Sequence, residues 1–209
     1  MPRAPRDWRQ VLQQAERQVR GRDLKAFEHL RPAFRWRYDT ARNAAVALAA
    51  ELGSPAVPYL LKVLTTAETA VERRAAADAL AGIGGPEAVQ ALRGALRDPN
   101  MVVRRAAMTG LLRLGANESV PRILPLLKDA SGGVRVLAAN VLGRFRDRRA
   151  VPSLRRALRD SKWYVRQAAA VALGEIRDPR AIPSLKRALK DTRKAVVSAA
   201  SVSLRALKR

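Results

Sequence analysis

The apolar positions of this chain follow a helical spacing. Val151, Leu154 and Leu158 recur at i, i+3 and i+7, which places them on one face of a helix. A second helical face follows, and its members are Val165, Ala168, Ala169, Ala172, Leu173 and Ile176. Polar and glycine-containing stretches separate the two faces. The pattern therefore predicts pairs of short helices joined by turns, and no strands.

The ends of the predicted helices carry turn residues. Pro152 and Pro183 stand in the first turn of a first helix, where the missing N–H of proline costs little. Gly143, Gly174 and the dipeptide Asp178-Pro179 are expected to end the second helices. Small alanines on the second helices should let neighbouring helices approach closely.

The helical pair repeats every 31 residues. Residues 160–190, DSKWYVRQAAAVALGEIRDPRAIPSLKRALK, align without gaps with residues 129–159 and 98–128. An arginine marks the register, and the sixth step lands on a valine: Arg42, Arg73, Arg104, Arg135, Arg166 and Val197. Self-similarity at this period is typical of a solenoid, in which stacked hairpins share a continuous core because one hairpin cannot bury its apolar face alone.

The repeat predicts a capping helix in residues 1–22 and one solenoid domain in residues 23–209. Trp8, Leu12, Ala15 and Val19 share a face of the capping helix, with Trp8 expected in its core. The first helix of the first pair is expected to be bent or broken at Pro32. The pairs run roughly over residues 23–53, 54–84, 86–115, 117–146, 148–177 and 179–209.

The run V-R-x-x-A-A-x-x-L-G, followed by A-[VI]-P-x-L-x-x-[AL]-L, resembles the HEAT-repeat family, in particular the short repeats named after phycobilisome lyases. The resemblance covers about Asp39 to Arg209. It implies an all-α solenoid of about six hairpins, wound as a right-handed superhelix with the second helix of each pair on the inner, concave side. It implies no single function, because the family serves many.

Several kinds of chemistry have no residues to support them in this sequence. Cysteine is absent, which excludes disulfides and thiolate chemistry. The single histidine, His29, has no second ligand nearby, and the His–Glu pairs of the iron-binding HEAT hydroxylases are missing. Serines lack a partnering histidine, and no glycine-rich phosphate loop follows a strand. We therefore expect no enzyme, no metal and no cofactor.

The N-terminal sequence bears on location. MPRAPRDWRQ has no apolar signal-peptide region, and no run of residues approaches membrane-spanning length. We expect a cytoplasmic protein without a membrane partner, and favour a monomer.

Charge is the feature that changes this picture. Lysine and arginine number 41 against 18 acids, a net charge of +23. Residues 129–209 alone carry 20 bases against 6 acids. Self-repulsion of this size opposes compaction, so the excess indicates a partner of opposite charge.

Arginines on the second helices would line a groove if those helices are the inner ones. Arg74, Arg105, Arg113 and Arg144 would then converge on its middle, and guanidinium groups suit phosphate because they offer paired planar donors. A groove for an acidic peptide would show the same pattern. Cations on the first helices and in the loops complete the predicted binding set, which is Arg74, Arg105, Thr109, Arg113, Asn140, Arg144, Trp163, Tyr164, Gln167, Arg146, Arg149, Arg155, Arg156, Arg177, Arg180, Lys186 and Arg187.

Two further recurring features admit a structural interpretation. In three repeats an aspartate stands six residues before the register arginine, and we predict that the two pair and tie stacked repeats together. The cations that end the first helices either complement the helix C-terminus or contact a ligand. These cations are Arg97, Lys128, Arg159 and Lys190.

Two aromatic–basic clusters either pack between repeats or stack on bases. They are Arg35-Trp36-Arg37-Tyr38 and Lys162-Trp163-Tyr164.

Three functions remain open on these grounds. The first is a non-enzymatic scaffold whose basic surface docks nucleic acid or a ribonucleoprotein by phosphate contacts. The second is a protein–protein adaptor whose concave groove takes an acidic partner. The third is a HEAT-like alkylpurine DNA glycosylase, for which Glu51, Asp78 and Glu175 are the candidate groove acids, none of them on a matching motif. We favour the first.

Overall fold

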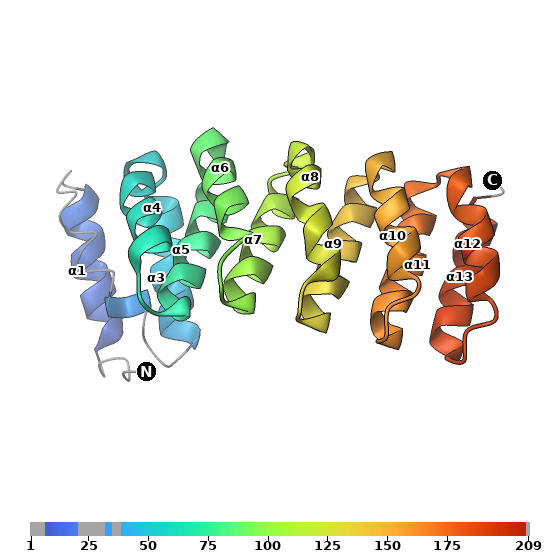
Figure 1. The fold of residues 1–209 in the computed structure, drawn as a ribbon. Coiled ribbons are helices and arrows are strands. Elements are labelled where there is room, and N and C mark those ends of the chain that lie inside the picture. The colour runs from blue at the N-terminus through green and yellow to red at the C-terminus, as the bar shows by residue number, and fades with distance from the viewer. Residues whose placement is uncertain (1–6, 21–31, 35–38, 208–209) are drawn as a thin grey trace. The chain divides into compact units, whose positions relative to one another are not determined.

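The structure, a computed structural model, describes residues 7–20, 32–34 and 39–207. Within these residues every regular element is a helix, arranged as successive helical hairpins of an α-solenoid (Figure 1). Their contacts divide the chain into two compact units, Met1–Leu114 and Gly115–Arg209. The predicted all-α solenoid is confirmed. The division into a cap and one solenoid domain, and the handedness of the superhelix, stay predictions.

Several predicted features lie outside the described residues. They are the cluster Arg35-Trp36-Arg37-Tyr38, the histidine His29 and most of the first helix of the first pair.

The first unit contains helix α1 (Trp8–Arg20), which packs against α3 (Asp39–Glu51). Leu12 is buried, whereas Trp8 is only half-buried and carries the Arg9 guanidinium 4.8 Å from its ring centroid. Trp8, predicted to lie in the core, is therefore only partly buried, and its ring also makes a cation–π contact at the surface.

Two hairpins complete the first unit. A 3₁₀ turn, η1 (Ser54–Ala56), leads into α4 (Val57–Thr66), which pairs with α5 (Ala70–Ile83). The second hairpin is α6 (Gly85–Ala95) with α7 (Met101–Arg113). Helix α5 packs against both α3 and α7, so the second helices form one layer of the unit. Fully buried side chains between the layers include Leu60, Leu80, Leu92, Met108 and Leu111.

The second unit holds three hairpins with short first helices. Its first helices are α8 (Val120–Ile123), α10 (Val151–Ala157) and α12 (Ile182–Ala188), each preceded by a 3₁₀ turn, η2 (Asn117–Ser119), η4 (Arg148–Ala150) and η5 (Pro179–Ala181). Its second helices are α9 (Gly132–Phe145), α11 (Trp163–Ile176) and α13 (Lys194–Ala206). After α8 the chain continues as the 3₁₀ helix η3 (Leu124–Lys128), because Pro125 cannot donate the next α-helical hydrogen bond.

The glycines near the ends of the second helices have a different role from the one predicted. Gly143 and Gly174 lie inside α9 and α11, which continue to Phe145 and Ile176. A Cβ atom on Gly174 would lie 3.0 Å from the Cα of Ser203 on α13, and one on Gly143 would lie 2.8 Å from the Cα of Ala172 on α11. Glycine is therefore required by the close crossing of neighbouring second helices, and the prediction that it ends them is wrong.

Three register arginines, Arg73, Arg135 and Arg166, tie consecutive repeats together, as predicted, but the carboxylate partner is a different one. Arg135 donates through Nε and Nη2 to Asp160, which lies 25 residues later in the next repeat, at 2.7 and 2.9 Å. Its Nη1 donates to the main-chain carbonyl of Asp129, six residues earlier, at 2.9 Å. The same arrangement joins Arg73 to Asp98 and Arg166 to Asp191. The side chains of Asp98 and Asp160 thus pair with the arginine of the preceding repeat. The main-chain carbonyls of the same two aspartates accept hydrogen bonds from the arginine six residues later, Arg104 or Arg166.

Candidate polyanion-binding surface

Four arginines gather between α10 and α12 in the second unit. They line a cavity of about 330 Å³, here called the α10–α12 cavity, whose walls are Pro152, Arg155, Arg156, Arg159, Ser184 and Arg187. The buried Ser184 hydroxyl accepts from Arg155 Nε at 3.0 Å and from Arg187 Nη2 at 3.1 Å. One hydroxyl therefore holds two guanidinium groups at the same cavity.

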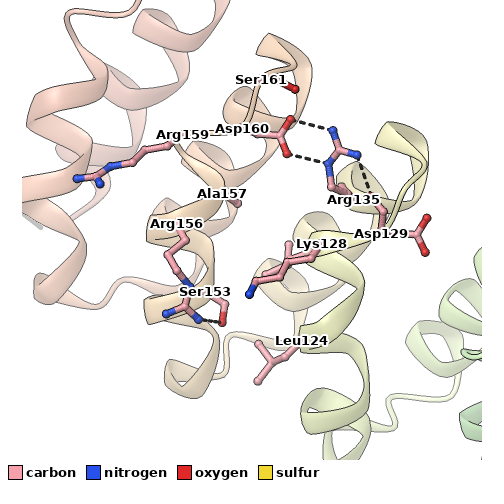
Figure 2. A pocket seen from close by; sticks show the side chains of 11 residues that line it. Leu124, Lys128, Asp129, Arg135, Ser153, Arg156, Ala157, Arg159, Asp160 and Ser161 are labelled. Atoms are coloured by element: carbon pink, nitrogen blue, oxygen red, sulfur yellow. Dashed lines mark hydrogen bonds and ion pairs between the residues drawn. The ribbon is translucent and has the colours of Figure 1, made fainter.

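A second basic cavity lies one repeat earlier, between η3 and α10. Its volume is about 460 Å³, and Lys128, Ser153, Arg156 and Arg159 are among its lining residues. Figure 2 shows Arg156 reaching Ser153, to which its Nη2 donates at 2.9 Å, while Arg159 extends away from the Arg135–Asp160 pair. This η3–α10 cavity shares Arg156 and Arg159 with the α10–α12 cavity.

The cations of the two cavities form no ion pair among the described residues, although two acids, Asp129 and Asp160, also line the η3–α10 cavity. These cations are Lys128, Arg155, Arg156, Arg159 and Arg187. Asp160, a carboxylate at the η3–α10 cavity, receives both of its charged hydrogen bonds from Arg135. Burial by itself would raise the pKa of Asp160, but the hydrogen bonds from Arg135 and from the Lys162 amide hold that pKa below its usual range.

The predicted loop arginines Arg149 and Arg180 are already paired. Each lies 2.6 Å from an aspartate two residues earlier, Asp147 or Asp178. The hydrogen bond from Arg180 lowers the pKa of Asp178 to about 2 against the opposing effect of burial. These two arginines therefore add less to the external positive field than their number suggests.

The second helices of this unit form a different kind of cleft. A cavity of about 460 Å³ between α11 and α13, the α11–α13 cleft, includes Arg146, Gln167, Val171, Arg177 and Val202 in its lining. Val171 is 41% exposed and Val202 is 54% exposed. The structure thus brings together three predicted binding residues, Arg146, Gln167 and Arg177, beside exposed apolar side chains.

The aromatic pair at the start of α11 is half-exposed. Trp163 and Tyr164 make an edge-to-face contact with ring centroids 5.8 Å apart, and each is 39% exposed. A Cβ atom on Gly132, in the preceding repeat, would lie 3.0 Å from the Tyr164 ring. Tyr164 therefore packs on its neighbouring repeat and still presents part of its ring to solvent.

In the first unit, Arg74, Arg105 and Thr109 meet in a cavity of about 270 Å³ on α5 and α7. Arg74 Nε lies 3.4 Å from Asp78 Oδ2, so the candidate glycosylase acid Asp78 is engaged in an ion pair. Arg113 is exposed but does not line this cavity. Asn140, Arg144 and Lys186 are exposed residues of the second unit outside the cavities described above.

Neither a metal-binding cluster nor a single membrane-spanning helix is found among the described residues. In the part of the chain that the structure describes, no group of three or more histidine, cysteine, aspartate or glutamate side chains could hold a metal ion. No single helix there is long and apolar enough to cross a membrane, although Asn43–Glu51 and Ser54–Thr66, bent by 115° at their break, reach that length and composition together.

The predicted binding set omits residues that complete the two basic cavities. Lys128 and Arg159 belong to the cations for which the sequence leaves two roles open, and Ser153 and Ser184 carry no sequence-based prediction. The register contained the signal, since Ser153 and Ser184 are 31 residues apart and Arg159 follows Lys128 by the same interval.

The comparisons with known proteins agree with this architecture. A family model described as HEAT repeats matches residues 27–112, 57–135 and 120–205. An engineered protein of solved structure shares 20% identity over 94% of this chain and 96% of its own, with a TM-score of 0.56. A designed armadillo repeat protein in complex with the peptide (KR)4 shares 18% identity over 85% of this chain and 98% of its own, with a TM-score of 0.57.

A second designed armadillo repeat protein is 19% identical over the same shares, with a TM-score of 0.52. At these identities the likeness shows the fold alone. The search of curated proteins found no match.

Proposed function

Because this chain belongs to the HEAT-repeat family, whose stacked hairpins form a scaffold for binding, we propose that it docks a polyanion, nucleic acid or a ribonucleoprotein, without acting as an enzyme. The proposal rests on one observation, the five cations around the α10–α12 and η3–α10 cavities that have no carboxylate partner among the described residues. The net charge of +23 also favours a polyanionic ligand for the chain as a whole.

The mechanism is neutralisation of phosphate charge. Lysine and arginine side chains that contact phosphates release condensed counterions, so the affinity falls as salt rises. Guanidinium groups present paired planar donors that match phosphate oxygens. Phosphates carry no sequence information, so we expect backbone recognition in place of base readout.

The test is binding as a function of salt. Fluorescence anisotropy with labelled duplex DNA, single strands and structured RNA would be recorded between 50 and 300 mM salt. If four to six phosphates are neutralised, log K falls with log salt at a slope of about −4 to −5 for duplex DNA. An affinity unchanged over this salt range for every probe would overturn the proposal.

A second candidate function, a protein–protein adaptor, is favoured by a separate observation. The α11–α13 cleft combines exposed Val171 and Val202 with two cations, Arg146 and Arg177, against one acid, Glu175, which is a suitable lining for a peptide that carries apolar and acidic side chains. The designed armadillo repeat protein holds a basic peptide, (KR)4, whereas the net positive charge of this chain disfavours such a ligand.

The two functions differ in their response to nuclease. A protein partner retained on the immobilised chain after nuclease digestion, and released by Val171→Asp, would support the adaptor. Release of every partner on digestion would count against it.

A further inference from the structure

We propose that the α10–α12 and η3–α10 cavities act together as a two-point clamp on the phosphate backbone of a double-helical nucleic acid. This inference rests on the proposed function and adds to it the face that binds and the class of nucleic acid. The clamp lies on the first helices of the second unit, whereas the predicted groove lies on second helices.

The two cavities are successive copies of one position in the repeat. Ser153 at the first cavity corresponds to Ser184 at the second, 31 residues later. Each serine accepts a hydrogen bond from an arginine, Arg156 in one case and Arg155 with Arg187 in the other. The hydroxyls therefore restrain the guanidinium groups before any ligand arrives, which lowers the entropy cost of binding.

Arg156 and Arg159 line both cavities, so they are the centre of the clamp. Both side chains are exposed and neither forms an ion pair among the described residues. Packed neighbouring helices lie about 8–10 Å apart, and one strand of a duplex carries a phosphate about every 3.4 Å along the helix axis. Neighbouring cavities would accordingly be close enough to contact nearby phosphates of one backbone.

The lining of the clamp favours a duplex over a single strand. None of the described residues that line either cavity is aromatic, whereas proteins that bind single strands stack the bases on aromatic rings. Trp163 and Tyr164, the half-exposed rings of this unit, belong to the second helix α11. A duplex turns its bases inward and presents phosphates, which is what four arginines and two serines can bind.

The experiment compares two double variants that remove equal charge. Arg156→Gln/Arg159→Gln removes two unpaired cations from the clamp, and Arg149→Gln/Arg180→Gln removes two paired ones from the loops of the same unit. Anisotropy titrations would use a labelled 20-base-pair duplex and a single strand of equal length at 100 mM salt. Far-UV circular dichroism and thermal unfolding establish that each variant is folded.

The clamp variant is expected to bind the duplex at least 10-fold more weakly, and its salt slope should fall by about 2, close to 0.9 for each phosphate that is no longer neutralised. The loop variant should stay within about 3-fold of the unsubstituted protein, because Arg149 and Arg180 are already paired with Asp147 and Asp178. Ser184→Ala, which leaves the charge unchanged, should weaken duplex binding about 3-fold. This variant replaces the clamp variant in the test if the latter does not fold.

The possible failures are distinguishable. Salt-dependent duplex binding that the clamp variant and Ser184→Ala leave intact overturns the clamp and leaves the proposed function standing. Tighter binding of the single strand than of the duplex also overturns it. Absence of salt-dependent binding to every probe overturns the proposed function and the clamp together.

Discussion

At the residue scale, one position of the repeat changes its chemistry along the chain. The residues at 31-residue intervals that follow the second helices all have positive φ angles, between 52° and 76°; they are Gly53, Gly84, Gly115, Arg146 and Arg177. Glycine adopts this region without steric cost, whereas another L-residue loses about 1–2 kcal/mol. In the last two of these positions the backbone is therefore strained, and the guanidinium groups of Arg146 and Arg177 line the α11–α13 cleft.

Replacing Arg177 by glycine should therefore stabilise the fold. We expect Arg177→Gly to raise the free energy of unfolding by about 0.5–1 kcal/mol. Relief of the steric strain stabilises the folded state, and the greater entropy of glycine in the unfolded chain offsets part of that gain. Urea denaturation measures the difference, and Arg177→Ala, which keeps the strain, is the control. A glycine variant less stable than the alanine variant would contradict the assignment of strain.

Buried Asp178 shows how a single ion pair couples to pH. Its side chain is 5% exposed and accepts a hydrogen bond from the main-chain N–H of Arg180 at 2.9 Å. The side-chain hydrogen bond from Arg180 lowers the pKa of Asp178 to about 2. A carboxyl whose pKa is lower in the folded than in the unfolded state stabilises the fold above its unfolded pKa. That stabilisation disappears as the pH falls from about 4 towards 2.

Asp178→Asn keeps the polar oxygen and removes the charge. We expect the variant to be less stable at pH 7 by about 1–2 kcal/mol, a figure reduced for the solvent exposure of Arg180. The difference from the unsubstituted protein should shrink at pH 3, be small at pH 2 and vanish below it. Urea denaturation at the three pH values tests this, and a difference that is constant with pH would show that the charge contributes nothing.

At the scale of elements, hairpins are joined by two devices that lie near opposite ends of the second helices. Glycines such as Gly174 let second helices cross closely, and the register arginines connect the turns of consecutive repeats. In the pair of Arg135 with Asp160, both side chains are 12% exposed. The hydrogen bond to Asp160 raises the pKa of Arg135 above its usual range, against the effect of burial.

Arg135→Ala should destabilise the second unit by about 2–4 kcal/mol, because it leaves Asp160 poorly solvated and two carbonyls without their donor. Arg159→Ala, which removes an exposed arginine of the same unit, should stay within about 0.5 kcal/mol. Thermal unfolding of both variants compares them. Equal destabilisation would mean that the register arginines do not hold the repeats together.

At the scale of the whole molecule, positive charge is concentrated where pairing is weakest. Aspartates of the protein pair with three register arginines, Arg73, Arg135 and Arg166, and with the loop arginines Arg149 and Arg180. The first helices of the second unit carry cations without such partners among the described residues, at the two cavities that share Arg156 and Arg159. Net charge thus indicates a polyanionic ligand, and the distribution of ion pairs points to the face that would bind it.

The 31-residue period and its apolar faces determine the fold from the sequence, because a helical hairpin buries its apolar face only against another copy of itself. The alternation of first and second helices, and the structural role of the arginines at the register position, follow from the same period.

Which residues meet across the hairpins depends on the tertiary structure. The partner of Arg135 is 25 residues away, Gly174 is explained by Ser203 on another helix, and Arg155 meets Arg187 only through Ser184. Spacing along the chain assigns a side chain to a helix face. Stacking of the helices decides its neighbours, and those neighbours decide whether a cation is neutralised or left to bind a ligand.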